Sequence, residues 1–104
     1  MKIGNLLSTI GLCRRAGKLV MGFDAVVQEI SRPKTKAAGI VLAADVSAKT
    51  CKEVGFEAAK HGTQVVQAGF TMDEAKDAIG KRCGVFLITD GGLFGSVKKN
   101  IESR

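Results

Sequence analysis

A basic segment that leads into a glycine carries the clearest chemistry in this sequence. Arg14, Arg15 and Lys18 stand a few residues before Gly22, and an apolar helical pattern begins directly after that glycine. A helix that begins at a glycine presents unpaired backbone N–H groups and a partial positive charge. Phosphate groups bind at such helix starts. The spacing therefore predicts an anion site at Gly22, with cationic side chains beside it.

Side chains that commonly perform catalysis or bind metals are few and scattered. The three cysteines, Cys13, Cys51 and Cys83, are odd in number and lack C-x-x-C spacing. Neither a disulfide framework nor a zinc site is therefore expected. His61 stands alone before Gly62, a pattern that is typical of a helix end. We predict no catalytic residues, no metal site and no cofactor.

One further segment could hold a phosphate. Residues 89–92 place an aspartate and two glycines after an apolar run, and a strand that leads into two glycines and a helix can bind phosphate. The segment matches neither of the common glycine-rich nucleotide-binding patterns. We therefore interpret Asp90 as a helix N-cap.

Helical and strand patterns alternate along the chain. Segments with a 3.6-residue apolar period predict helices, and short apolar runs predict strands. The predicted helices cover residues 4–16, 23–31, 47–60, 71–79 and the segment after Asp90, and the predicted strands are centred on Val20 and on residues 40–44, 64–66 and 85–88. This order predicts an α/β protein, a three-layer α/β/α sandwich with a small mixed central sheet of about four strands and helices on both faces.

Residues at the ends of these segments indicate where the helices begin and end. Gly17 is expected to close the first helix. Either Asp45 or Ser47 can cap the third, and Thr71 with Glu74 forms a capping-box pattern at the start of the fourth. The apolar positions of that fourth helix are expected to be buried: Met72, Ala75, Ala78 and Ile79.

Length and composition indicate a folded chain. Its 104 residues suit a single domain covering residues 1–104, and its 45% hydrophobic residues are typical of a globular protein. No apolar run is long enough to span a membrane, and the N-terminus lacks the pattern of a secretory signal. We therefore expect a cytoplasmic monomer with no membrane partner.

Positive charge is concentrated toward the two ends of the sequence. The net charge is +6, and the middle of the chain is acidic. If the two ends meet in the fold, they form one basic face, which is typical of nucleic-acid-binding proteins. A generally basic, soluble surface is the alternative.

Four segments resemble those of a known family. They are residues 11–22, 40–47, 78–81 and 88–90, and they occur in the family's order and roughly at its spacing. The chain resembles bacterial members of the superfamily of ribosomal proteins that bind RNA kink-turns, the L7Ae and L30e type. The resemblance implies a non-enzymatic, RNA-binding ribosomal-protein-like domain that recognises kink-turn-like or bulged RNA. Ribosomal RNA and the ribosome are its implied partners, in a ribonucleoprotein.

The resemblance also implies an RNA site at the helix that follows Gly22. In kink-turn binders of this family, that helix supplies an Asn–Glu pair and, one turn further on, a Lys, which reach guanine edges of sheared G·A pairs and adjacent phosphates. The matching positions here are Asp24, Ala25 and Gln28. Asp24 lacks the amide donor, Ala25 offers nothing to a base, and Gln28 lacks the charge that holds a phosphate. This departure predicts weaker recognition of standard kink-turns, with a salt slope lower by about one.

Two further contact regions are implied by the resemblance. The loop after the fourth helix contains Lys81 and Arg82 here, and in the family it packs against an extruded base; an arginine can stack on a base or bind phosphate. A smaller contribution is implied beside Asp45, and the three loops share one edge of the fold. The RNA-binding residues expected from the sequence are Lys18, Gly22, Phe23, Asp24, Ala25, Gln28, Asp45, Val46, Ser47, Lys81, Arg82, Arg14 and Arg15.

Other interpretations stay open at this level. Asp45 and Asp90 at strand ends are compatible with a small-molecule site in an α/β protein, although no catalytic set accompanies them. A substrate-recognition domain related to RNA-modifying enzymes is a further alternative. Phe23 either stacks on a base or packs into the core.

Overall fold

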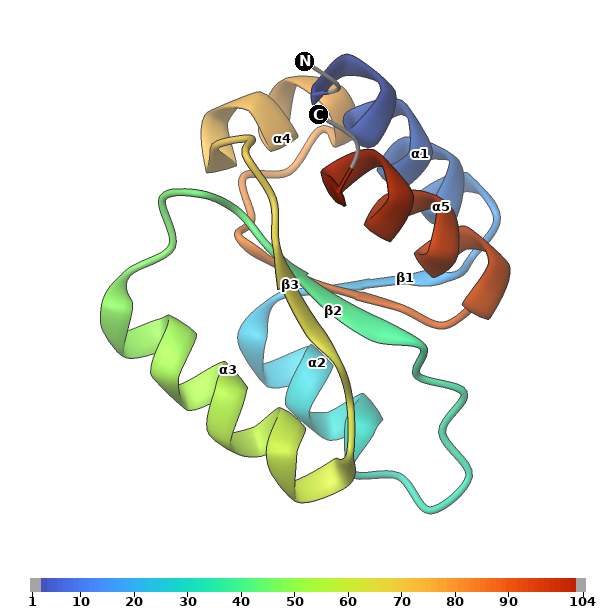
Figure 1. Ribbon diagram of the computed structural model, residues 1–104, viewed down its shortest axis with the longest axis vertical. Helices are drawn as coiled ribbons and strands as arrows, with labels where there is room; N and C mark the ends of the chain where they lie inside the picture. The colour runs from blue at the N-terminus through green and yellow to red at the C-terminus, as the bar shows by residue number, and fades with distance from the viewer. Residues whose placement is uncertain (1–2, 103–104) are drawn as a thin grey trace.

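A computed structural model describes residues 3–102, and within them helices and strands alternate as predicted (Figure 1). None of these helices has the length and hydrophobicity needed to cross a membrane. The elements are α1 (Ile3–Arg15), β1 (Leu19–Met21), α2 (Phe23–Ile30), β2 (Gly39–Leu42), α3 (Ala48–His61), β3 (Val65–Gln67), α4 (Met72–Ile79), β4 (Val85–Ile88) and α5 (Gly91–Glu102).

The four strands form one mixed sheet in the order β1-β4-β2-β3. β4 is antiparallel to both of its neighbours, and β2 is parallel to β3. β1, β2 and β3 therefore point in the same direction, and β4 runs the opposite way. As a result, one end of the sheet holds the last residues of three strands and the first residue of β4. We call it the carboxyl end, and it is defined by Met21, Leu42, Gln67 and Val85.

Helices cover both faces of this sheet, so the predicted three-layer α/β/α sandwich is confirmed (Figure 1). α1, α4 and α5 lie on one face, where their apolar side chains pack with Val41 and Phe86. α2 and α3 lie on the other face and pack with Ile40 and Leu87. Each of these sheet residues is completely buried, and burying such a side chain contributes about 1.5–3 kcal/mol.

The two central strands are buried on both faces. Every residue of β2 and of β4 is buried, as their unbroken apolar runs predict. On the α1 side, the rings of Phe70 and Phe86 meet edge to face with centroids 5.9 Å apart. β2 and β4 therefore form the buried centre of the sheet between the two layers of helices.

Close packing of α5 on the sheet depends on Gly39, the first residue of β2. A Cβ atom at this position would lie 2.1 Å from Cζ of Phe94. The Phe94 side chain is itself only 5% exposed, so it has little room to move away. Gly39 thus leaves the space that the aromatic ring occupies.

The predicted helix caps are present. Ser47, rather than Asp45, caps α3 by accepting a hydrogen bond from the backbone N–H three residues further on. Thr71 and Glu74 form the complete capping box of α4. The Asp90 carboxylate accepts a bond of 2.9 Å from a backbone N–H in the first turn of α5. Asp90 therefore acts as the N-cap that the sequence indicates.

One predicted core position is wrong. Ala78 is exposed and Met72 is half-buried, whereas Ala75 and Ile79 are buried as predicted. Ala75 and Ile79 lie one turn apart on the stripe of this short helix that faces the sheet. Ala78 is displaced by about 100° around the helix from Ile79, because an α-helix has 3.6 residues per turn. Its small side chain points away from the core.

Candidate nucleic-acid interface

Three loops meet at the carboxyl end of the sheet, and backbone hydrogen bonds join them. Gly22 N–H donates to the Val85 carbonyl at 2.9 Å, and Ala43 N–H donates to the Gly84 carbonyl at 2.9 Å. Ala44 N–H, one residue further along, donates to the loop after β3. The segments after β1, after β2 and before β4 therefore lie side by side, as the sequence-based interpretation requires.

The start of α2 has the geometry of the predicted anion site. Gly22 is the N-cap with φ 99° and ψ 145°, and as a glycine it has no side chain with which to cap this helix end. Only glycine adopts such a backbone conformation readily. The first-turn N–H groups of α2 therefore donate no hydrogen bond to an N-cap side chain, and they lie at the positive end of the helix dipole.

The residues that follow Gly22 form an exposed surface on α2. Asp24, Ala25 and Gln28 are all exposed, while Val26 and Ile30 are buried against the sheet. Asp24 and Gln28 lie one turn apart on the same side of the helix. The structure thus places the three family-matched positions together on the solvent side of α2.

Phe23 packs against the core and is also partly exposed. It is half-buried and packs against the apolar cluster between α2, α3 and the sheet. Part of its ring also lines an open groove on the α3 side. Phe23 therefore supports the core and contributes to the surface beside the α2 start.

The loop between α4 and β4 presents two exposed cations, Lys81 and Arg82. The Arg82 Nε donates to Asp73 Oδ1 at 2.9 Å, and these side chains are 54% and 78% exposed. An ion pair this exposed contributes little stability, about 0–1 kcal/mol. Arg82 can therefore exchange Asp73 for another anion at small cost.

The loop after β2 supports its neighbours through its side chains. Asp45 Oδ1 accepts a bond of 2.9 Å from the backbone N–H of Met72, at the start of α4. Val46 is half-buried and lies so close to Gly84 that a Cβ atom there would be 2.6 Å from Val46 Cγ2. Ser47 caps α3. These three predicted contact residues therefore have structural roles, and Asp45 and Ser47 are also exposed.

Lys18 does not lie beside Gly22, and this part of the sequence-based prediction is wrong. Lys18 precedes β1, and its carbonyl accepts a hydrogen bond from Thr89 N–H, which follows β4. The residue is therefore at the end of the sheet opposite the carboxyl end. The physical reason is that β1 is extended, rising about 3.3 Å per residue, and separates Lys18 from Gly22 along its whole length.

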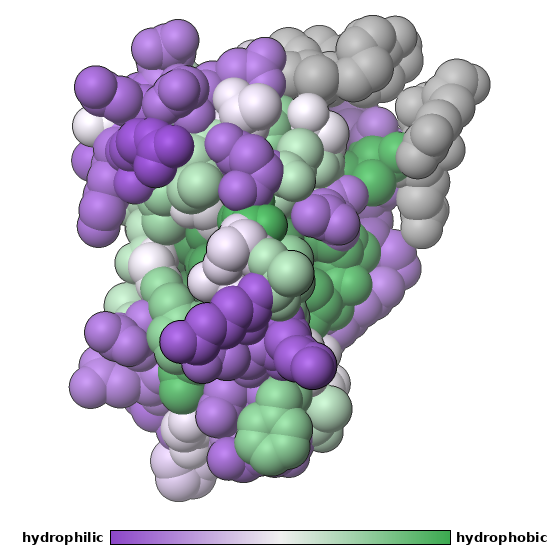
Figure 2. Space-filling model, turned by 90° about the vertical axis from the view of Figure 1, so that its left-hand side faces the viewer, coloured by the Kyte–Doolittle hydropathy of each residue, from purple (hydrophilic) through white to green (hydrophobic). Residues whose placement is uncertain are grey.

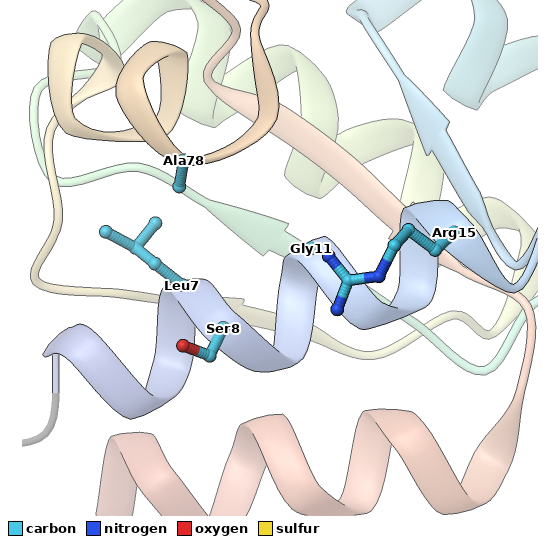
Figure 3. Close-up of a pocket in the computed structure, with 5 residues that line it drawn as sticks. All are labelled: Leu7, Ser8, Gly11, Arg15 and Ala78. Atoms are coloured by element: carbon cyan, nitrogen blue, oxygen red, sulfur yellow. The ribbon is translucent and has the colours of Figure 1, made fainter.

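Arg14 and Arg15 also lie away from the α2 start. Arg14 Nη1 donates to the carbonyl of Ile79 at 2.6 Å, so it binds the C-terminal end of α4, where cations are favoured. The Arg15 side chain runs back along α1 toward Gly11 and lines a pocket of about 350 Å³ between α1 and α4 (Figure 3). Arg14 thus supports the loop that carries Lys81, and Arg15 faces a different surface.

A curated protein from Enterococcus faecium is similar to nearly the whole chain. RNA-binding protein YlxQ is 32% identical over 96 residues, which cover 92% of this chain and 90% of YlxQ. The chain belongs to the L7Ae family. This family is the one that the four sequence segments indicate. No model of a known protein family matches the sequence.

Two solved structures share the fold of this L7Ae-family chain. A protein of unknown function from Bacillus halodurans aligns with a TM-score of 0.82 at 24% identity, covering 94% of this chain and 97% of that one. A 15.5 kD RNA-binding protein from Giardia lamblia aligns with a TM-score of 0.73 at 16% identity, covering 94% and 85% of the two chains. At these identities the likeness concerns the fold alone.

The arrangement of the L7Ae-family chain does not assemble the alternative small-molecule site. Asp45 follows β2 and Asp90 follows β4, and these strands are antiparallel, so the two carboxylates lie at opposite ends of the sheet. Each accepts a hydrogen bond from the start of a helix instead. Within residues 3–102, no three His, Cys, Asp or Glu side chains come together as a metal site requires.

The thiol of Cys13 is completely buried. Burial raises its pKa, and the negative charge of Asp90 adds to the effect. A thiol with a raised pKa stays protonated near neutral pH, and the thiolate is the reactive form.

Two groups near the carboxyl end are absent from the sequence-based site. Asp73 forms an ion pair with Arg82, nine residues further along the chain, and no local sequence pattern predicts that contact. Lys52 and Phe56 of α3 line the groove beside Phe23, and their helical spacing from Lys49 could have indicated a shared face.

Figure 2 views the left-hand side of Figure 1, toward which β2 runs; hydrophilic side chains gather above and below on this face, with more hydrophobic atoms exposed between them.

Proposed function

We propose that this protein is a non-enzymatic RNA-binding protein that recognises structured RNA through the carboxyl end of its sheet. The single observation that carries the proposal is the hydrogen bond from Gly22 N–H, at the start of α2, to the carbonyl of Val85, which directly follows the loop that carries Lys81 and Arg82. The name of the relative YlxQ, an RNA-binding protein, supports the same function. Kink-turn-like or bulged RNA is the proposed target, in the cytoplasm and in association with the ribosome.

Recognition begins with phosphate binding at the α2 start. First-turn N–H groups without a side-chain cap bind one phosphate, and the carboxylate of Asp24 and the amide of Gln28 reach base edges from the exposed side of the helix. The exposed methyl group of Ala25 adds no hydrogen bond. Kink-turn binding by this chain is therefore expected to rely more on shape and backbone contacts than on base readout.

The second part of the RNA site is the loop before β4. Lys81 and Arg82 bind the strand opposite the α2 start, and Arg82 leaves Asp73 when a phosphate or an unstacked base arrives. Val46, which lies close to Gly84, and the exposed Ser47 supply the smaller third contact. The proposed complex is a monomer of this protein on one bent or bulged RNA segment.

Binding to three RNAs of matched length tests this function: a kink-turn, a duplex with a single bulge and an uninterrupted duplex. Fluorescence anisotropy over a series of salt concentrations gives the Kd of each. We expect the distorted RNAs to bind at least about tenfold more tightly than the duplex, because shape readout favours them. Equal affinity for all three, with the same salt slope, would show nonspecific cationic binding and overturn the proposal.

Arg82→Ala is expected to weaken binding of the bulged RNA about tenfold and of the plain duplex much less, because Arg82 contacts the distorted strand. Asp73→Asn is expected to strengthen binding up to about threefold, since it frees Arg82 from an exposed ion pair. Lys99→Ala on α5 is the charge-matched control, because it removes one positive charge from an exposed position elsewhere. Equal losses for Arg82→Ala and Lys99→Ala would contradict the assignment of the loop.

A further inference from the structure

One face of α3 combines cations with an exposed aromatic ring. Lys49, Lys52, Phe56 and Lys60 are spaced at i, i+3, i+7 and i+11, so they lie along one side of the helix. All four are exposed, and the Phe56 side chain is 65% exposed. From Lys49 to Lys60 the face extends about 16 Å at 1.5 Å per residue. We call these four residues the α3 face.

The α3 face continues directly from the proposed RNA site. Phe23, the first residue of α2 after Gly22, lines an open groove together with Lys52, Glu53, Phe56 and Glu57 of α3. The groove has a volume of about 580 Å³. A strand bound at the α2 start therefore reaches the α3 face without crossing another element.

Three of the four residues of the α3 face are cationic, and of the two glutamates that line the adjoining groove, Glu57 is paired with Lys60. Within residues 3–102, neither Lys49 nor Lys52 forms an ion pair. Lys60 lies over the Phe56 ring with its Nζ 5.4 Å from the centroid, and it also pairs with Glu57 at 3.4 Å. The cations without an ion pair are thus on the N-terminal half of the face, nearest the groove.

We propose that the α3 face binds a single-stranded extension of the same RNA, with one base stacked on Phe56 and the adjacent phosphates held by Lys49 and Lys52. The inference rests on the proposed RNA-binding function and extends the bound segment beyond the carboxyl end of the sheet. An exposed aromatic side chain with lysines on the path of the backbone is the usual composition of a single-strand site. Every base can stack, so this contact adds affinity with little sequence preference.

Two RNAs that share one folded segment test the inference. One ends bluntly and the other carries a short single-stranded extension on the strand that leaves the α2 site. Wild-type protein is expected to bind the extended RNA about tenfold more tightly, since stacking of one base has that magnitude. Phe56→Ala and Lys52→Ala should each remove most of this gain and leave the Kd for the blunt RNA unchanged.

Matched variants separate base stacking from a general apolar contact. Leu12→Ala removes another exposed hydrophobic side chain, 47% exposed on α1, and should keep the full gain. Phe56→Trp should keep or increase the gain, whereas Phe56→Leu, which retains an apolar side chain without a ring, should lose it. Thermal unfolding verifies that each variant is folded. Because these side chains are exposed, their replacement is expected to leave the fold intact.

The outcomes distinguish this inference from the function on which it rests. If wild-type protein binds the blunt RNA tightly and the extension adds no affinity, the α3 face is not an RNA-binding site, and the proposed function is unaffected. An equal gain in wild type and in Phe56→Leu overturns base stacking on Phe56. Failure of wild-type protein to bind either RNA overturns both proposals.

Discussion

Gly22→Ala is expected to lower the affinity for distorted RNA about tenfold and to reduce the free energy of unfolding by about 1–3 kcal/mol. The cause is conformational, because no atom lies within 4 Å of a Cβ built at this position. At φ 99° the backbone is strained for alanine, yet its N–H is bonded to Val85 and its carbonyl to Val26. The strain is relieved only if a peptide group rotates, and this rotation changes the direction in which the first-turn N–H groups of α2 point.

Gly17→Ala is the matched control for this experiment. Gly17 also has a positive φ, 72°, and nothing lies within 4 Å of its Cβ position. It follows α1 and stands next to Lys18, at the opposite end of the sheet. The variant should lose a similar amount of stability and keep its RNA affinity, as measured by urea unfolding and anisotropy. Loss of affinity in both variants would indicate that the effect comes from stability alone.

Gly39→Ala is expected to destabilise the protein by about 3 kcal/mol, near the upper end of the usual range for inserting a methyl group into a packed core. The added Cβ would lie 2.1 Å from Cζ of Phe94, and the ring is buried against the sheet. Urea unfolding monitored by circular dichroism measures the loss. The RNA affinity of the folded fraction should be unchanged, because Gly39 is at the opposite end of β2 from the proposed site.

A second substitution verifies that the clash with Phe94 is the cause. Phe94→Leu alone leaves a cavity and destabilises the protein, but in the Gly39→Ala background it removes the clash. The double variant should therefore be more stable than the sum of the single effects, with a coupling energy of about 0.5–3 kcal/mol. Gly55→Ala, in a helix with open space around its Cβ position, should be neutral or stabilising. Additive losses at positions 39 and 94 would contradict a steric conflict between these two side chains.

The sequence predicts the elements of this fold well, because local chemistry determines them. The capping box at Thr71, the N-cap at Asp90 and the apolar runs of β2 and β4 each need only neighbouring residues to be interpreted. The resemblance to a family then implies that three loops lie at one end of the sheet. In the structure, Gly22 N–H donates to the Val85 carbonyl and Ala43 N–H donates to the Gly84 carbonyl, so these loops lie side by side.

The charged residues are harder to place because their positions depend on tertiary contacts. Arg14 donates a hydrogen bond to the carbonyl of Ile79, which is 65 residues away in the sequence. Arg82 forms an ion pair with Asp73, which is nine residues away. Lys18 is close to Gly22 in sequence, yet a strand of three residues separates them in space. The distribution of charge along the sequence also does not reveal the α3 face, because its lysines lie within the acidic middle of the sequence.

The position of β4 has a consequence for when the protein becomes functional during its synthesis. β4 is the last strand within residues 3–102 but lies between β1 and β2; its first residue, Val85, accepts a hydrogen bond from Gly22 N–H, and Gly84 just before it accepts one from Ala43 N–H. A nascent chain that stops before residue 85 lacks the strand that joins these loops. Competence for the proposed RNA binding therefore arises only after residues 85–88 have emerged and paired with β1 and β2.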